Sequence, residues 1–347
     1  MLRLGGLRNV RFQSTVATVA SSRQKCLDEL KKHDKSSYII QSYVQNEHAR
    51  DAFIAIRSLC LDLSKLNSGA TGTRRAGSDV SEPSQIKLGF WREGIQRVFQ
   101  RSENKSGALN HPTLALLDAT LDHVDLSKRY FITLIQSREA YMGNRPFPDV
   151  DSMAVYGEGL FSQPNYLFLE ATVGTSKNTT EFLKLNPEVH SELHTIIAHI
   201  GQGSGIAALL KGLPYYISQR NYVPLPVKGL VDHHLSEEEI LRGTFDKEKL
   251  SSLIFEVATR ANDHMISAKT LLEQLKSNLN SVPDAPKGGY FTSAMFLPMM
   301  SYIPTKIFLE KLEAADFDIF SSKLQTKDNI ALPYKSWRAS QTKSLPE

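Results

Sequence analysis

The sequence predicts an all-α protein with a single folded domain. Apolar residues recur at helical spacing through most of the chain, whereas no stretch alternates apolar and polar residues for long enough to predict a sheet. The chain has 347 residues, of which 41% are hydrophobic and 22% charged, an ordinary globular composition that supports a sizeable core. No repeat of fixed period appears, so one helical domain is the simplest interpretation.

The predicted helices follow one another along the chain with short breaks. They cover residues 47–66, 86–100, 112–124, 127–142, 152–173, 187–213, 245–279 and 290–314. Pro164 is expected to kink or divide its helix, and residues 174–180 are expected to form a polar loop. A short helix begins at Ser236, where Glu239 completes a capping box. Residues 67–85 combine Gly, Ser, Thr and Pro with mixed charges, a composition that predicts a mobile loop.

Residues 1–23 are expected to be a disordered mitochondrial presequence that is cleaved, which leaves residues 24–347 as the folded domain. The segment has no acid, and its basic residues are Arg3, Arg8, Arg11 and Arg23. Its basic and apolar residues separate onto two sides of a helix, and it lacks the continuous apolar segment of a secretory signal. A solvated basic tail is the alternative. Because these arginines account for the whole net charge of +4, the rest of the chain offers no electrostatic basis for binding nucleic acid.

Several sites suggested by short motifs are rejected. The small residues at 201–205 match neither a dinucleotide-binding loop nor a nucleophile elbow, and they are expected to permit close helix contact. His190, His194 and His199 form the best metal-like cluster, but they lack the spacing of a zinc motif and the remaining ligands, so we expect no metal and no cofactor. Residues 288–305 carry no charge, yet two prolines interrupt them. A buried core helix is therefore favoured over a membrane span, with a surface-dipping helix as the alternative.

Three stretches in a fixed order resemble the squalene/phytoene synthase family of all-α isoprenoid synthases. They are residues 55–65, the pair Phe90-Trp91, and residues 200–216 followed by Arg220 and residues 223–226. The similarity covers most of the chain after about residue 37. It implies an isoprenoid-synthase-like single domain with a central cavity, in which two acidic motifs on facing helices hold the Mg²⁺ ions that bind a leaving diphosphate.

Both acidic motifs of that family are degenerate in this sequence. The acidic positions of the first motif fall on Leu61, Asp62 and Lys65. The positions of the second motif fall on Lys211, Gly212, Tyr215 and Tyr216. No Asp or Glu occurs in residues 195–228, and a single carboxylate does not hold two or three Mg²⁺ ions. Asp62 stays open to two interpretations, a paired acid on the helix or a remnant of the cavity.

A mitochondrial, non-catalytic branch of the same family serves the assembly of respiratory complex I, the NADH:ubiquinone oxidoreductase, and this chain resembles its members. The similarity includes residues 199–206 and 211–214 and extends to the C-terminal run 316–320. It implies a matrix protein, peripheral to the inner membrane, whose partners are complex I subunits or other assembly factors. On this interpretation the chain is a pseudoenzyme without catalytic residues.

Two other functions stay open. Residues expected to line a retained cavity are Tyr156, Phe161, Tyr166, Gly203, Leu210, Tyr215, Phe291 and Met295. Such a cavity suits an isoprenoid, quinone or lipid, although core packing is favoured for most of these residues. Binding of this kind is compatible with a role in assembly. A residual prenyl transferase of the inner membrane is the remaining alternative, and it needs a metal site that the sequence lacks.

Overall fold

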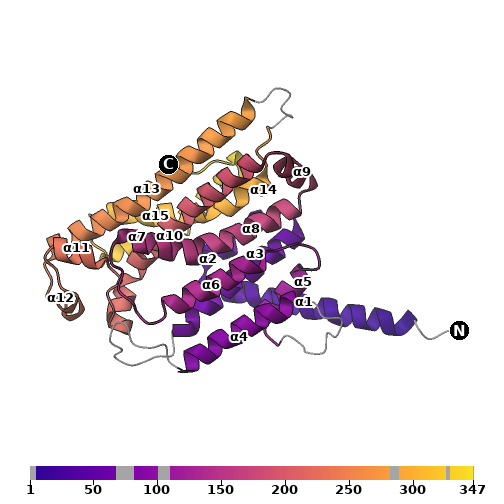
Figure 1. Cartoon of the computed structure of the whole chain (residues 1–347), viewed down its shortest axis with the longest axis horizontal. Helices are drawn as coiled ribbons and strands as arrows, with labels where there is room; N and C mark the ends of the chain where they lie inside the picture. Colours follow the sequence, from indigo (N-terminus) through magenta and orange to yellow (C-terminus); the bar gives the residue numbers. More distant parts are fainter. Residues whose placement is uncertain (1–4, 68–81, 101–109, 282–288, 326–328, 347) are drawn as a thin grey trace.

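The computed structural model describes residues 5–67, 82–100, 110–281, 289–325 and 329–346, which form a bundle of helices (Figure 1). The α-helices are α1 (Gly5–His33), α2 (Lys35–Ile40), α3 (Glu47–Ser64), α4 (Glu82–Phe99), α5 (Pro112–Thr120), α6 (Lys128–Ala140), α7 (Val150–Gly157), α8 (Gln163–Gly174), α9 (Lys177–Leu185), α10 (Pro187–Arg220), α11 (Val227–Asp232), α12 (Glu237–Arg242), α13 (Lys247–Asn280), α14 (Ser293–Phe296), α15 (Tyr302–Glu313) and α16 (Ala331–Thr342). Single turns of other helix types are η1 (Gln41–Tyr43), η2 (Lys65–Asn67), η3 (Glu158–Ser162), η4 (Leu297–Ser301) and η5 (Ser322–Gln325). Within these ranges the β-type pairing is limited to an isolated bridge between Phe147 and Pro226, which confirms the all-α prediction.

Helix α10 runs through the middle of the domain, with α13 packed along it (Figure 1). Its apolar residues point in several directions, and Ile197, Ile206 and Leu210 are fully enclosed. A helix that is apolar all round is stable only when neighbours cover it on most sides. Of the helices in the described ranges, α10 alone is long and apolar enough to cross a membrane, and 67% of its apolar window is buried inside the domain.

Glycines set how closely α10 approaches its neighbours. A Cβ atom on Gly205 would lie 2.2 Å from the Cα atom of Gly157 in α7. On another side of α10, a Cβ atom on Gly203 would lie 2.8 Å from the carbonyl oxygen of Ala261 in α13. Both distances are shorter than carbon atoms tolerate, so only glycine fits at these crossings. The interpretation of residues 201–205 as a close helix contact is therefore confirmed.

The expected join at Pro164 takes the form of a π-helical turn. Helices α7 and α8 run into each other through η3, which ends just before Pro164. Proline has no N–H to donate to the preceding turn, so the regular α-helical hydrogen bond to residue 160 is missing here. A π-helical turn is one way for a helix to continue past such a gap.

Several elements differ from the sequence prediction. Helix α9, which was not predicted, begins at Lys177 and shortens the predicted polar loop at 174–180. Helix α10 continues through Pro214 to Arg220, because the burial of neighbouring residues such as Leu213 outweighs one lost hydrogen bond. Helix α4 begins at Glu82, so the predicted mobile loop does not extend to residue 85, and residues 68–81 lie outside the described part of the chain. The capping box at Ser236 is confirmed.

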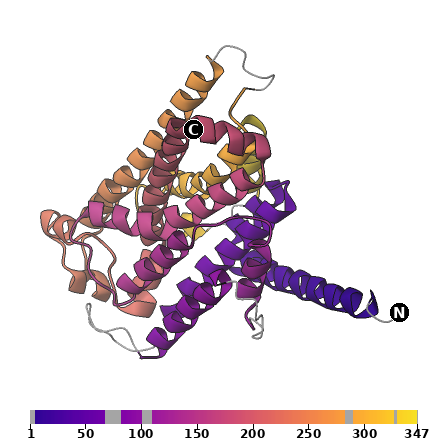
Figure 2. The ribbon, with the colours of Figure 1, turned by 45° about the vertical axis from the view of Figure 1, so that its right-hand side comes forward.

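Helix α1 crosses the boundary expected at residue 23, and its N-terminal part projects from the body (Figure 2). Ser22 is buried, and Arg23 Nη2 pairs with Asp51 at 2.5 Å and with Glu47 at 2.9 Å, both on α3. The segment before residue 23 continues, from Gly5 onward, into the helix that opens the domain. The presequence and its cleavage stay predictions.

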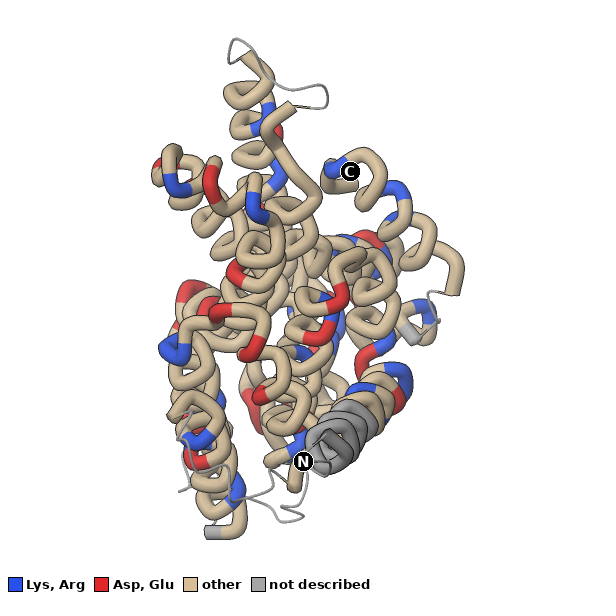
Figure 3. The backbone as a smooth tube through the Cα atoms, turned by 90° about the vertical axis from the view of Figure 1, so that its right-hand side faces the viewer, with Lys and Arg blue, Asp and Glu red and all other residues tan. Residues whose placement is uncertain are grey.

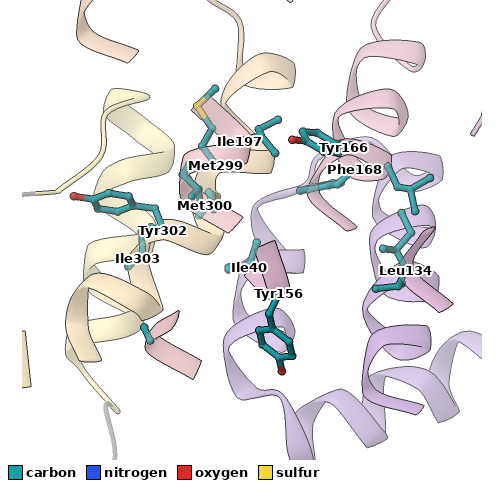
Figure 4. Packing of buried hydrophobic residues seen from close by; sticks show 14 of the residues in the cluster. Ile40, Leu134, Tyr156, Tyr166, Phe168, Ile197, Met299, Met300, Tyr302 and Ile303 are labelled. Atoms are coloured by element: carbon teal, nitrogen blue, oxygen red, sulfur yellow. The ribbon is translucent and has the colours of Figure 1, made fainter. Parts of the chain in front are cut away.

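From residue 289 onward, the uncharged segment 288–305 forms α14, η4 and the start of α15, and most of α14, η4 and α15 in this segment is buried in the core. Met299, Met300 and Tyr302 are almost fully buried. Figure 4 shows them in the same packed region as Ile197 of α10 and Phe168 of α8. The preference for a core helix over a membrane span is confirmed for these described residues.

Basic and acidic residues are interspersed along the outer helices (Figure 3). Several pair across neighbouring helices, such as Arg92 of α4 with Glu139 of α6 and Lys335 of α16 with Glu310 of α15. This mixture agrees with the near-neutral charge of the chain beyond its first residues.

Candidate functional site

The first degenerate motif lies at the C-terminal end of α3 and faces α1 and α5. Thr113 Oγ1 donates a hydrogen bond of 2.8 Å to Asp62 Oδ2, and His111 Nε2 lies 4.0 Å from the same oxygen. Burial raises the pKa of Asp62, against the opposing effects of the Thr113 hydrogen bond and of His111. Lys65 pairs with Glu29 of α1. Asp62 is therefore a paired acid in a contact between helices.

The second degenerate motif occupies the last turns of α10. Lys211 lines one cavity, whereas Tyr215 and Tyr216 line another. The ring of Tyr216 lies against Gly212, because a Cβ atom at Gly212 would stand 2.6 Å from the ring atom Cε2. The two motifs thus do not surround one common space, since Asp62 faces α5 and lines neither of these cavities.

The central cavity, of about 170 Å³, lies between α2, α3, α8, α10, η4 and α15. Phe53, Phe161 and Phe168 form part of its apolar wall. At one end Arg57 Nη2 donates to Asp34 Oδ2 at 2.8 Å. Burial opposes both charges, but their mutual attraction raises the pKa of Arg57 and lowers the pKa of Asp34. The cavity therefore combines an apolar body with a charged but internally neutralised end.

The second cavity, of about 190 Å³, is more polar, and we call it the tyrosine–arginine pocket. Its lining consists of Ser64, Arg138, Tyr141, Asn144, Phe147, Tyr156, Leu209, Tyr215, Tyr216, Arg220 and Tyr222. Arg138 Nε and Nη2 donate to the carbonyl oxygens of Leu63 and Ser64, each at 3.0 Å. Arg138 thereby caps the end of α3, where carbonyl groups lack helical partners.

The residues expected to line a cavity are divided between several places. Phe161 lines the central cavity, and Tyr156 and Tyr215 line the tyrosine–arginine pocket. The others lie in packed regions away from both linings, as core packing predicts: Tyr166, Gly203, Leu210, Phe291 and Met295. Leu61 of the first motif is likewise packed against the core. Helix crossings, rather than a shared cavity, account for most of this set.

The three histidines of α10 fall into two places: His190 and His194 lie next to each other, with ring centroids 4.6 Å apart, and His199 lies elsewhere. The ring of His194 stacks on Tyr166 at 4.8 Å, and burial lowers its pKa to about 4. His199 Nδ1 lies 3.1 Å from Nδ1 of His264 on α13. No group of three or more His, Cys, Asp or Glu side chains in the described residues has an arrangement that would hold a metal.

Several lining residues were not anticipated from the sequence. Asp34 and Arg57 form the charged end of the central cavity, and Arg138, Asn144 and Arg220 line the tyrosine–arginine pocket. Arg57 and Arg220 lie within or beside the stretches that carry the family resemblance. Asp34, Arg138 and Asn144 carry no local sequence pattern that predicts a cavity, because charged and polar residues of these types are mostly exposed.

Comparison with known proteins agrees with this architecture. The chain is similar to complex I assembly factor 6 of Rattus norvegicus, with 25% identity over 341 residues that cover 97% of this chain and 88% of the relative. It is also similar to the Drosophila melanogaster homolog of that factor, with 26% identity over 317 residues that cover 90% of this chain and 82% of the relative.

Two solved structures share the fold. A dehydrosqualene synthase superposes with a TM-score of 0.68 at 10% identity and covers 95% of this chain and 98% of its own. A squalene synthase from Alicyclobacillus acidocaldarius superposes with a TM-score of 0.61 at 11% identity, and the match covers 86% of this chain and 95% of that synthase. These likenesses confirm the isoprenoid-synthase-like helical fold. The family model for squalene/phytoene synthase matches residues 30–329, and the chain therefore belongs to the squalene/phytoene synthase family.

Proposed function

We propose that this chain is a non-enzymatic mitochondrial assembly factor for respiratory complex I on the scaffold of a prenyl synthase. The similarity to proteins named complex I assembly factor 6 supports this role, because it extends over nearly the whole chain and reaches from mammals to Dictyostelium discoideum. Partners would be complex I subunits or other assembly factors. The basic, acid-free N-terminus supports import into the matrix.

The divergence of the two motifs is the observation that carries the non-enzymatic part. Ionising a prenyl diphosphate needs Mg²⁺ ions held by several carboxylate oxygens around one space. Here Tyr215 and Tyr216 of α10 line a pocket with two arginines, while Asp62 of α3 accepts a hydrogen bond from Thr113 of α5 and does not line that pocket. The guanidinium groups in this pocket repel Mg²⁺, and its neutral phenol groups are poor ligands for that ion.

The test is profiling of respiratory complexes on native gels, with mitochondria from cells that lack this gene. Wild type and Asp62→Asn are each reintroduced. We expect a selective loss of complex I that both versions restore, since asparagine keeps an oxygen that accepts from Thr113. Intact complex I, or rescue by wild type alone at equal protein abundance, would contradict the proposal.

A second function, binding of an isoprenoid, quinone or lipid, is favoured by the central cavity. Its apolar wall and single charged end match an amphipathic molecule. Mass spectrometry of organic extracts from the chain purified from mitochondria tests this. A stoichiometric co-purified lipid supports it, and an extract without one counts against it. A residual prenyl transferase would instead show Mg²⁺-dependent release of diphosphate from a prenyl diphosphate.

A further inference from the structure

The tyrosine–arginine pocket has more hydrogen-bond donors than its own residues satisfy. The hydroxyl groups of Tyr141, Tyr156 and Tyr216 have no hydrogen-bond partner among the described residues, although Tyr156 is only 7% exposed. Tyr222, by contrast, donates to the carbonyl oxygen of Arg145 at 2.7 Å. These hydroxyls open onto the pocket, where they are able to donate to a ligand that accepts hydrogen bonds.

The same pocket has positive charge without a matching carboxylate. Arg220 contacts only the ring of Tyr215, at 5.9 Å, and makes no ion pair within the described ranges. Arg138 uses two N–H groups on neutral carbonyl oxygens. The lining includes Asn144 but neither Asp nor Glu. In the central cavity, whose lining also includes Lys211, Asp34 neutralises Arg57. The lining of the tyrosine–arginine pocket, by contrast, has two arginines and no carboxylate.

The aromatic side chains that form the wall of the pocket are held in place by contacts with one another and with the main chain. The ring of Tyr216 fits against Gly212 one turn earlier and makes edge contacts with Tyr215 and Tyr222 at 5.9 and 6.0 Å. The main chain anchors the hydroxyl of Tyr222. Gly212 and Tyr216 stand at positions of the degenerate second motif, so these two positions now form part of the packed pocket wall.

From this arrangement we propose that the tyrosine–arginine pocket binds a small organic anion, a carboxylate or phosphate attached to a planar apolar body, directly and without a metal ion. Arg138 and Arg220 bind the anionic group, since charge-assisted hydrogen bonds from guanidinium groups are the strongest in proteins. The phenol groups donate further hydrogen bonds, and the rings pack against the planar body. The proposal rests on the proposed loss of Mg²⁺ chemistry at this site.

A cationic ligand is the obvious competitor, because tyrosine-rich cages also bind ammonium groups. Such cages act through the negative faces of their rings. Here the guanidinium groups of Arg138 and Arg220 stand in the same lining and would repel a cation. The charge of the pocket therefore selects an anion.

The experiment is isothermal titration calorimetry of the full chain with phenyl phosphate, benzoate and inorganic phosphate, each in EDTA and in Mg²⁺. We expect phenyl phosphate or benzoate to bind equally well in both buffers and more weakly at high salt, with inorganic phosphate weaker still. The better of the two organic probes identifies the anionic group. Arg220→Gln should weaken binding by about tenfold or more, as expected for a lost charge-assisted hydrogen bond.

Two further variants keep the test specific. Tyr216→Phe removes one hydroxyl but keeps the ring against Gly212, and it should weaken binding several-fold without lowering the melting temperature. Lys211→Gln removes a cation from the same helix at the central cavity and should leave the affinity unchanged.

Absence of heat with all three probes at millimolar concentration would overturn the proposal, as would binding that Arg220→Gln and Tyr216→Phe leave intact. Either result leaves the assembly function standing if complex I is still lost without the gene. Binding that requires Mg²⁺, with turnover of a prenyl diphosphate, would overturn the non-enzymatic function as well.

Discussion

At Asp62, the carboxylate is held by its neighbours in the bundle and not presented to a cavity. Thr113 of α5 donates to it, and Lys65, one turn later, pairs with Glu29 of α1. From the sequence, the acid was open to two interpretations, because residue spacing places it on a helix face without showing what that face meets. The helix packing supports the paired acid.

His199 and His264 illustrate a buried polar contact with a pH-dependent stability. Their Nδ1 atoms lie 3.1 Å apart, and Nε2 of His264 is buried without a partner in the described structure. Burial, followed by the nearby His199, lowers the pKa of His264 to about 4. The neutral form is thus favoured in the folded state.

The expected result is a loss of stability on acidification. An unfolded histidine titrates near 6.5, so the unfolded chain binds more protons than the folded chain between that pH and about 4. The free energy of unfolding should fall across this window, by about 3 kcal/mol for one such group before the discount for its partial exposure. Urea unfolding at several pH values measures this change in the free energy of unfolding. His264→Gln should flatten the slope, whereas His33→Gln at an exposed position should not.

Among the secondary elements, α10 depends on glycine at its crossings. Gly203→Leu would force a side chain into Met265 and the main chain of Ala261, to which even a Cβ atom would come within 2.4 and 2.8 Å. Overpacking of this kind costs about 1–3 kcal/mol or more. We expect a lower melting temperature and less protein in mitochondria. Gly89→Leu is the control, because a Cβ atom there meets nothing within 4 Å; an equal effect of both variants would contradict the crossing.

Helix α16 carries exposed aromatic residues that suit the peripheral contact with the inner membrane implied by the family resemblance. Tyr334 and Trp337 are 56% and 52% exposed, and Arg338 follows directly. Trp and Tyr favour the membrane interface, and basic residues favour anionic lipid. Changing both aromatics to Ser should reduce flotation with cardiolipin-containing vesicles several-fold. Ile266→Ser on α13 is the control, because Ile266 is also 52% exposed, and it should leave flotation unchanged. Equal flotation of the wild type, the double variant and Ile266→Ser would argue against membrane contact through α16.

For the whole molecule, the docking of α1 limits where a presequence can end. Ser22 is buried, and Arg23 pairs with Asp51 of α3, which is itself largely buried. Removing Arg23 would leave the Asp51 carboxylate without its partner, a costly change. We therefore expect cleavage in residues 12–21, which N-terminal sequencing of the mature protein from mitochondria determines. A mature chain that begins after Arg23 would contradict this docking.

The sequence by itself determined the helices, because the signals that define them are local. Helical spacing of apolar residues, the capping box at Ser236 and the interruption at Pro164 each act within a few neighbouring positions, and each is found in the structure. The order of the similar stretches also identified the isoprenoid-synthase-like fold. Errors occurred at α9, a helix that was not predicted, and at the end of α10, where packing extends a helix beyond its local signals.

Only the tertiary structure decided which side chains share a cavity. Arg138 on α6, Tyr156 on α7 and Arg220 on α10 meet in one pocket, while Gly203 and Leu210, on the same helix as Arg220, pack into the core. Periodicity gives the face of a residue on its own helix, but not the partner helix, the crossing distance or the space left between them. Those depend on contacts between residues far apart in the chain, and so the charge and shape of the pocket emerge only when the helices are packed.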